Sequence, residues 1–97
     1  MTERGLRLLG LGLRAGSAVV GVAGVRAGLQ RGDLALVVLA GDYGPRTADK
    51  VLRLAQGRRV PVLLGPGARE MGHRLGRATV QAAGVRDPRL AAGMLRS

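Results

Sequence analysis

The 97-residue chain contains no cysteine, phenylalanine or tryptophan, and Tyr43 is its only aromatic residue. Without cysteine, the chain has no disulfide framework, no thiolate nucleophile and no zinc–thiolate site. Without Phe and Trp, it lacks the rings on which the single-strand binders of the RRM and cold-shock types stack bases. It also lacks an uninterrupted run of the ~20 apolar residues that a membrane span requires. No membrane partner is therefore expected.

Acidic residues are also scarce. Six of them stand against fifteen arginines and the single Lys50, for a net charge of +10. So basic a surface is most easily understood if phosphate groups neutralise it, which points to nucleic acid. Because Phe and Trp are missing, structured RNA recognised through shape and phosphates is the favoured partner. The absence of cysteine makes the chain indifferent to the redox compartment, and a cytoplasmic bacterial protein fits. The alternative is a GC-rich coding bias, which raises Arg, Gly and Ala together, and the glycines number 17.

Candidate catalytic groups are few. His73 is the single histidine, so neither the common nucleophile–base pairs nor a multi-histidine metal site can be assembled. Asp42 and Asp49 are better explained as arginine partners and helix caps than as a carboxylate pair. We therefore predict a non-enzyme without a cofactor.

The apolar periodicity switches back and forth between the helical and the extended pattern, which is typical of an alternating α/β layer fold. The chain length predicts one domain, residues 1–97. The clearest strand is LALVVLA (residues 34–40), because apolar residues at every position indicate a central strand buried on both faces. Further strands are expected at residues 17–20, 60–64 and 79–82, and helices at 2–16, 21–31, 45–57, 68–75 and 87–95.

Two glycine-rich segments need comparison with phosphate-binding loops. Residues 10–16 (GLGLRAG) superficially resemble a dinucleotide-binding fingerprint. That fingerprint follows a strand and has glycines at positions one, three and six, whereas here they stand at one, three and seven, inside or at the end of a predicted helix. Gly65, Gly67 and Gly72 do follow a strand and precede a helix, but a plain turn is the simpler explanation.

The order and spacing of the segments resemble a known family. The resemblance is carried by LLGLGLRAG (residues 8–16), Gly21, a helix ending in Gly32, LALVVLAGDYGPRT (34–47), VPVLLG (60–65) and MGHRLG (71–76). This series is similar to the YlxQ-like bacterial branch of the kink-turn-binding ribosomal protein family over nearly the whole chain. The resemblance implies a three-layer α/β/α sandwich around a small mixed four-stranded sheet. It also implies an RNA partner with kink-turns, in which tandem sheared G·A pairs bend the duplex.

The family reads kink-turns with a Gly-x-Asn-Glu stretch that opens the second helix, followed by a basic residue three positions later. In this chain the five motif positions fall on Gly21, Val22, Ala23, Gly24 and Ala27. The Asn, Glu and basic side chains are therefore absent, and each such contact is worth about 1–3 kcal/mol of discrimination. A helix N-terminus and the neighbouring Arg26 remain and suit a phosphate. The resemblance thus implies RNA binding with weakened kink-turn recognition.

A second family contact comes from the apolar loop before the last helix, expected here at residues 82–87. Small apolar residues such as Val85 would let a splayed base approach, and Arg86 would meet its phosphate. The alternative is an ordinary loop in which Asp87 caps a helix. Arg46 and Lys50 lie after the central strand, in a region that the family places near the RNA, and Asp42 is expected to form a turn there.

Two functions remain open. One is an RNA-binding module associated with the ribosome or another structured RNA. The other is a protein-interaction or scaffold domain on the same fold, with a ribosomal or acidic protein partner. Arginines concentrated around residues 21–27, 42–50 and 82–89 favour RNA, and an even scatter favours the protein partner. A monomer is expected.

Overall fold

The computed structural model describes all 97 residues. Its centre is a four-stranded sheet with the order β1-β4-β2-β3. The strands are β1 (Ala18–Val20), β2 (Leu36–Leu39), β3 (Val62–Leu64) and β4 (Ala82–Val85). β4 runs antiparallel to both β1 and β2, whereas β3 runs parallel to β2. The expected mixed four-stranded sheet is therefore confirmed.

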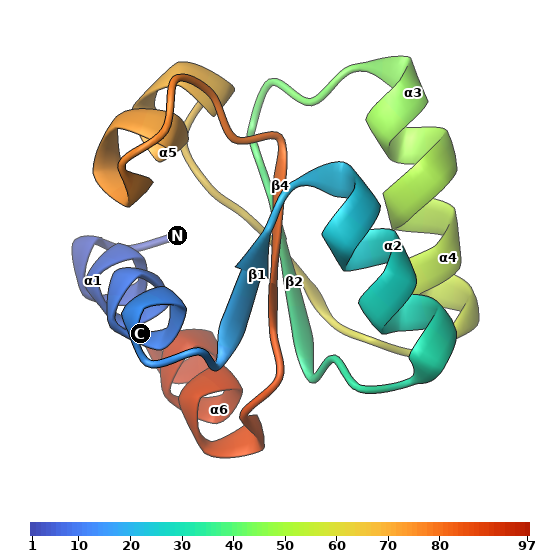
Figure 1. Cartoon of the computed structure of the whole chain (residues 1–97), viewed down its shortest axis with the longest axis horizontal. Helices are drawn as coiled ribbons and strands as arrows, with labels where there is room; N and C mark the ends of the chain where they lie inside the picture. Colours follow the sequence, from blue (N-terminus) through green and yellow to red (C-terminus); the bar gives the residue numbers. More distant parts are fainter.

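Helices cover both faces of this sheet (Figure 1). One layer contains α1 (Glu3–Arg14), α5 (Ala68–Leu75) and α6 (Pro88–Arg96). The other contains α2 (Val22–Arg31) and a continuous helix made of α3 (Pro45–Thr47), the π-helical η1 (Ala48–Leu52) and α4 (Arg53–Gly57). The three-layer α/β/α architecture is thus confirmed. None of these helices is long and apolar enough to cross a membrane.

β2 divides the hydrophobic core into two halves. Leu36 and Val38 pack with the first helical layer, and Val37 and Leu39 pack with the second, because successive side chains of a strand point to opposite faces. All four residues are fully buried. The expected central strand, buried on both faces, is therefore confirmed.

The helix ends agree with the capping residues in the sequence. The Thr2 hydroxyl accepts the Gly5 N–H at 3.0 Å at the start of α1, and Asp87 caps α6 by accepting the Arg89 N–H at 2.8 Å. The helix expected at residues 45–57 is continuous, but its π-helical turn was not predicted. Such turns insert one extra residue into a helix and have no clear sequence signal.

The position of β4 corrects the sequence prediction. A strand was expected at residues 79–82 and a loop at 82–87, because Ala82, Ala83 and Gly84 are poor strand formers. The structure instead places Ala82–Val85 in the middle of the sheet. Small residues are needed there, since a Cβ at Gly84 would lie 2.7 Å from Leu34 Cδ1. Tertiary packing therefore overrides local propensity.

A strand is present within residues 60–64, as expected, but it is less buried than expected. β3 lies at the edge of the sheet, and Leu64 is 51% exposed. Residues 77–81 include the start of the strand expected at 79–82, but in the structure they run back along α5. The Arg77 N–H donates to the Gly72 carbonyl at 2.7 Å and the Val80 N–H to the Ala68 carbonyl at 2.9 Å.

Candidate nucleic-acid interface

Strand pairing brings the starts of three helices to one edge of the sheet. In the register of the strands, Val20 faces Ala83, and Leu39 faces both Ala82 and Leu64. β1, β2 and β3 therefore end where β4 begins, and α2, α3 and α5 start from that edge (Figure 1). The first N–H groups of a helix carry partial positive charge, so the edge suits anions.

Gly21 is the residue from which α2 starts. This residue adopts φ 107° and ψ 149°, a conformation that residues with a Cβ rarely adopt. Its N–H donates to the Ala82 carbonyl at 2.8 Å, which ties the helix start to β4. No side chain caps α2. The N–H groups of its first turn are therefore left for water or a ligand.

Arg26 lies in the second turn of α2 and is partly buried. Its Nε atom is buried without a hydrogen-bond partner, and no carboxylate forms an ion pair with it. A buried N–H donor without a hydrogen-bond partner is unfavourable. An anion bound beside Arg26 would accept that hydrogen bond.

The start of α3 adds a second part to the site. Gly44, Pro45, Arg46 and Thr47 form an open depression together with Gln81. The Gln81 Oε1 atom is buried without a partner, while Arg46 and Lys50 are exposed one helical turn apart. We call residues 21–27, 44–50 and Gln81 the α2–α3 edge. Gln81 was missed in the sequence, because its position here depends on where β4 begins.

Asp42 organises the neighbouring loop. It lies in the expected turn after β2, and its Oδ1 also accepts the Ala68 N–H at 2.8 Å, so that it caps α5. The same two loops are joined by the Gly41 N–H donating to the Pro66 carbonyl at 2.9 Å. Since Asp42 already occupies the start of α5, Gly65 and Gly67 are explained by the turn and its cap rather than by a phosphate.

Replacing Asp42 with alanine should lower the free energy of unfolding by about 1 kcal/mol, because the start of α5 loses its cap. Asp42→Asn keeps an oxygen acceptor and should retain most of the stability. Urea denaturation of both variants measures the difference. Equal stability of the alanine variant and the unchanged protein would contradict the capping role.

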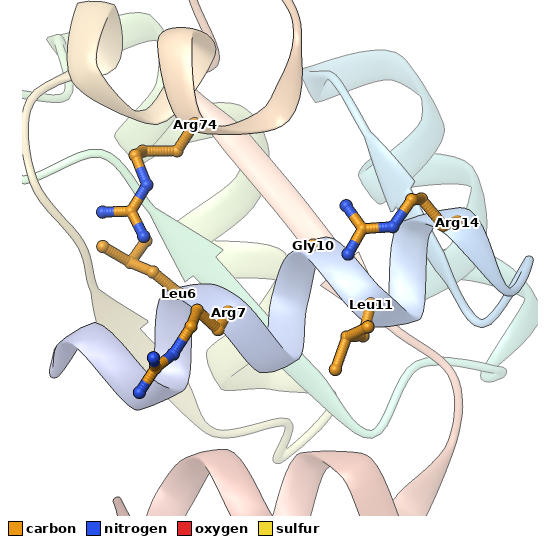
Figure 2. A pocket seen from close by; sticks show the side chains of 6 residues that line it. All are labelled: Leu6, Arg7, Gly10, Leu11, Arg14 and Arg74. Atoms are coloured by element: carbon orange, nitrogen blue, oxygen red, sulfur yellow. The ribbon is translucent and has the colours of Figure 1, made fainter.

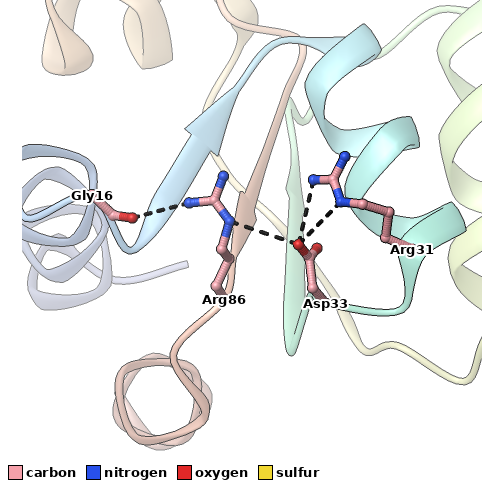
Figure 3. Close-up of polar contacts among 4 residues, drawn as sticks. All are labelled: Gly16, Arg31, Asp33 and Arg86. Atoms are coloured by element: carbon pink, nitrogen blue, oxygen red, sulfur yellow. Dashed lines mark hydrogen bonds and ion pairs between the residues drawn. The ribbon is translucent and has the colours of Figure 1, made fainter.

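Val85 and Arg86 lie away from the α2–α3 edge. Val85 is fully buried in β4. Arg86 follows at the opposite end of that strand, where its Nη1 donates to the Gly16 carbonyl at 3.0 Å and its Nε lies 4.0 Å from Asp33 (Figure 3). Asp33 also accepts hydrogen bonds from Arg31 at 3.3 Å. The loop expected at residues 82–87 is therefore corrected: Val85 belongs to β4, and Arg86 lies at the edge of the sheet opposite the α2–α3 edge.

The basic residues are spread over both helical layers. The α2–α3 edge contains only the cations Arg26, Arg46 and Lys50. The helical layer of α1, α5 and α6 contains Arg4, Arg7, Arg14, Arg69, Arg74, Arg89, Arg96 and, just after α5, Arg77. The arginines are therefore not concentrated around residues 21–27, 42–50 and 82–89, the distribution that would favour RNA. Charge distribution alone therefore does not favour RNA over an acidic protein at this edge.

The remaining candidate motifs have structural explanations. Gly10 and Gly12 lie inside α1 rather than in a loop after a strand. A Cβ at Gly12 would overlap a methyl group of Leu90, so this glycine lets α1 and α6 approach closely. His73 is exposed on α5, and no group of three or more His, Asp or Glu side chains is placed to hold a metal ion.

Comparison with known proteins agrees with this fold. The sequence model described as the Ribosomal protein L7Ae/L30e/S12e/Gadd45 family matches residues 4–92. The chain belongs to this family. No curated protein sequence matches the chain.

Two solved structures resemble this L7Ae/L30e/S12e/Gadd45 family member. A protein with unknown function from Bacillus halodurans is 27% identical with a TM-score of 0.88, over 98% of this chain and 96% of that one. The 15.5kD RNA binding protein of Giardia lamblia is 17% identical with a TM-score of 0.77, over 99% of this chain and 88% of that one. At that identity, the second comparison shows a shared fold.

The start of α2 in this family member is poor in polar side chains. Ala23 is exposed, and Ala27 lies one turn further along the helix and is partly buried. A Cβ at Gly24 would lie 3.0 Å from Val19 Cγ2, so a larger residue would require Val19 to move. The neighbouring strand is therefore packed against a glycine at this position.

Proposed function

We propose that the chain binds structured RNA through the α2–α3 edge, without catalysing a reaction. The observation that carries the proposal is the partly buried Arg26, which has no acidic partner and follows the uncapped start of α2. Membership of a ribosomal protein family and the fold shared with an RNA-binding protein support it. The RNA is ribosomal or another structured RNA, and the protein acts as a monomer of the YlxQ-like bacterial branch.

The edge suits the sugar–phosphate backbone better than base edges. Arg26, Arg46 and Lys50 provide three cations, and the first turn of α2 provides N–H donors. Gln81 provides a buried side-chain acceptor without a hydrogen-bond partner. Because Ala23, Gly24 and Ala27 provide no polar side-chain group, we propose that binding depends on shape and phosphates, with only weak preference for sheared G·A pairs.

The second candidate function is binding of an acidic protein on the same fold. It is favoured by the spread of arginines over both layers rather than along one edge. The two functions differ in what the Arg26 region contacts, and binding to RNA or to polyglutamate distinguishes them.

Changing Arg26 and Arg46 together to alanine should weaken RNA binding and reduce the slope of log K against log salt by about 0.9 for each phosphate group that is no longer bound. The slope is measured by fluorescence titration against three RNAs: a kink-turn, the same RNA with its G·A pairs converted to Watson–Crick pairs, and a plain duplex.

The matched control is Arg58→Ala with Arg96→Ala. It removes the same charge from two exposed residues that have no ion pair and lie outside the edge. If both double variants reduce the slope equally, the α2–α3 edge has no special role. If the unchanged protein binds none of the RNAs but binds polyglutamate, the acidic protein partner is correct instead.

A further inference from the structure

A depression on the opposite helical layer is surrounded by arginines (Figure 2). It lies between α1 and α5 and has a volume of about 230 Å³. Its lining consists of Leu6, Arg7, Gly10, Leu11, Arg14 and Arg74. The glycine leaves the floor without a side chain, and a Cβ there would lie 3.6 Å from an Arg14 Nη1 atom. Three guanidinium groups therefore surround a shallow site with room for a small anionic group.

Most of this positive charge is uncompensated. Arg7 and Arg14 are exposed, and neither makes an ion pair or a side-chain hydrogen bond. Arg74 alone is paired, through hydrogen bonds to both Glu3 carboxylate oxygens. The hydrogen bond to Arg74 holds the pKa of Glu3 below its ordinary value, and the charges of Arg74 and Arg7 lower it further. Glu70 is the other acid whose charge acts on Arg74.

The helical spacing gathers these cations on one face. Arg7, Leu11 and Arg14 are four and three residues apart, so they lie along the same exposed side of α1. Arg4 extends this row at one end, and Arg69 and Arg77 are exposed on or just after α5. Like charges so close together repel one another unless an anion lies between them. We call the surface around Arg7, Arg14 and Arg74 the α1–α5 face.

The chemistry of the α1–α5 face favours phosphate over a peptide carboxylate chain. Guanidinium groups bind phosphate and carboxylate oxygens alike in a bidentate manner, so the shape of the surface decides between the two ligands. The depression is short and open, with only Leu11 exposed as a large apolar side chain inside it. It offers no sheet edge or long apolar groove for an extended peptide. A sugar–phosphate backbone that crosses α1 needs only cationic contacts to its phosphate groups, and Arg7, Arg14 and Arg74 provide them.

We propose that the α1–α5 face is a second binding site for the RNA backbone, which lets one protein molecule contact two RNA segments. This inference rests on the proposed RNA-binding function. The α1–α5 face and the α2–α3 edge belong to helical layers on opposite sides of the sheet (Figure 1). One protein can therefore hold two RNA segments together.

The test is a bridging assay. An immobilised RNA duplex is saturated with protein and washed, and a second, fluorescently labelled duplex is then captured from solution. The unchanged protein should capture it. Arg7→Gln with Arg14→Gln should bind the first duplex but lose capture, and the salt slope of the capture step should fall by about 0.9 for each phosphate group that is no longer bound. Glu3→Gln releases Arg74 from its partner and should increase capture.

The control is Arg58→Gln with Arg96→Gln, which removes the same charge elsewhere. Capture unchanged in the Arg7 and Arg14 variant, or abolished equally in the control, would overturn the inference. If the unchanged protein binds the first duplex but does not capture the second, this inference alone is refuted. If it does not bind the first duplex, the proposed function is refuted. Stronger binding of polyglutamate than of RNA at this face would assign an acidic protein and also overturn it.

A measurement on the unchanged protein avoids any effect of substitution on folding. The Nε–H signals of Arg7 and Arg14 in NMR spectra should shift as the second equivalent of duplex is added, with those of Arg58 and Arg96 unchanged. Signals of Arg7 and Arg14 that stay in place through two equivalents would refute the second site.

Discussion

The triple change Ala23→Asn, Gly24→Glu and Ala27→Lys is expected to raise the preference for a kink-turn over its Watson–Crick control at least tenfold. The changes introduce the polar side chains that the resemblance to kink-turn-binding proteins implies at the start of the second helix. Each polar contact to a base edge is worth about 1–3 kcal/mol of discrimination, and about 1.4 kcal/mol corresponds to a tenfold change in affinity. Fluorescence titration against the two RNAs measures the ratio.

The structure indicates how this variant must be built. Ala23 is exposed and accepts a longer side chain, and Ala27 lies one turn further along the helix. Gly24 is the difficult position, because a Cβ there would lie 3.0 Å from Val19 Cγ2. Val19→Ala is therefore included to make room, and Val19→Ala alone is the control. A folded variant without any gain in preference would show that the motif has been matched to the wrong residues.

The second large effect is expected at Gly72, where alanine should lower the free energy of unfolding by about 1–3 kcal/mol. A Cβ there would lie 2.7 Å from the carbonyl carbon and oxygen of Ala78 and from the Cα of Thr79. These are backbone atoms, so they cannot rotate away as the end of a side chain can. The segment after α5 would have to move, although the Gly72 carbonyl and the Arg77 N–H fix it by a 2.7 Å hydrogen bond.

Gly93→Ala in α6 provides the matched control. Its Cβ would meet only Leu8 Cδ1, at 3.7 Å, which is ordinary contact. Because alanine is the better helix former, this variant should be equal to or slightly more stable than the unchanged protein. Thermal and urea denaturation of both variants test the difference. Similar stability of the two would refute close packing at Gly72.

The Gly72 variant also tests how the α2–α3 edge is built. Residues 77–81 lead directly into β4, and Gln81 is the last of them. If that segment shifts, we expect RNA binding to weaken together with stability, although no residue of the edge has been changed. Gly93→Ala should leave RNA binding unchanged.

Much of the fold could be predicted because its signals are local. Thr2 and Asp87 cap their helices through backbone groups two or three residues away. The apolar run of β2 indicates a strand buried on both faces, and this signal does not depend on which strands pair with it. The weak strand β4 could not be located, because Ala82, Ala83 and Gly84 have low strand propensity. Gly84 is instead required by its close packing against Leu34.

The candidate site was predictable in part for the same reason. The resemblance pointed to Gly21 and to the neighbouring Arg26. Both belong to the α2 segment, so their relative position does not depend on the rest of the chain. Gln81 was missed and Arg86 was placed at the wrong edge, because both errors follow from the location of β4. The pairing of Arg74 with Glu3, 71 residues away, likewise had no sequence signal.

The sequence by itself determined the net charge, the absence of stacking rings and of thiol chemistry, the helix ends and the central strand. These properties depend on composition or on residues close together in the chain. Only the tertiary structure decided which loops meet at one edge of the sheet, which arginines have acidic partners, and that Arg7, Arg14 and Arg74 surround one depression. Those relations arise from strand pairing and helix packing between distant segments, and they depend on where every other element lies.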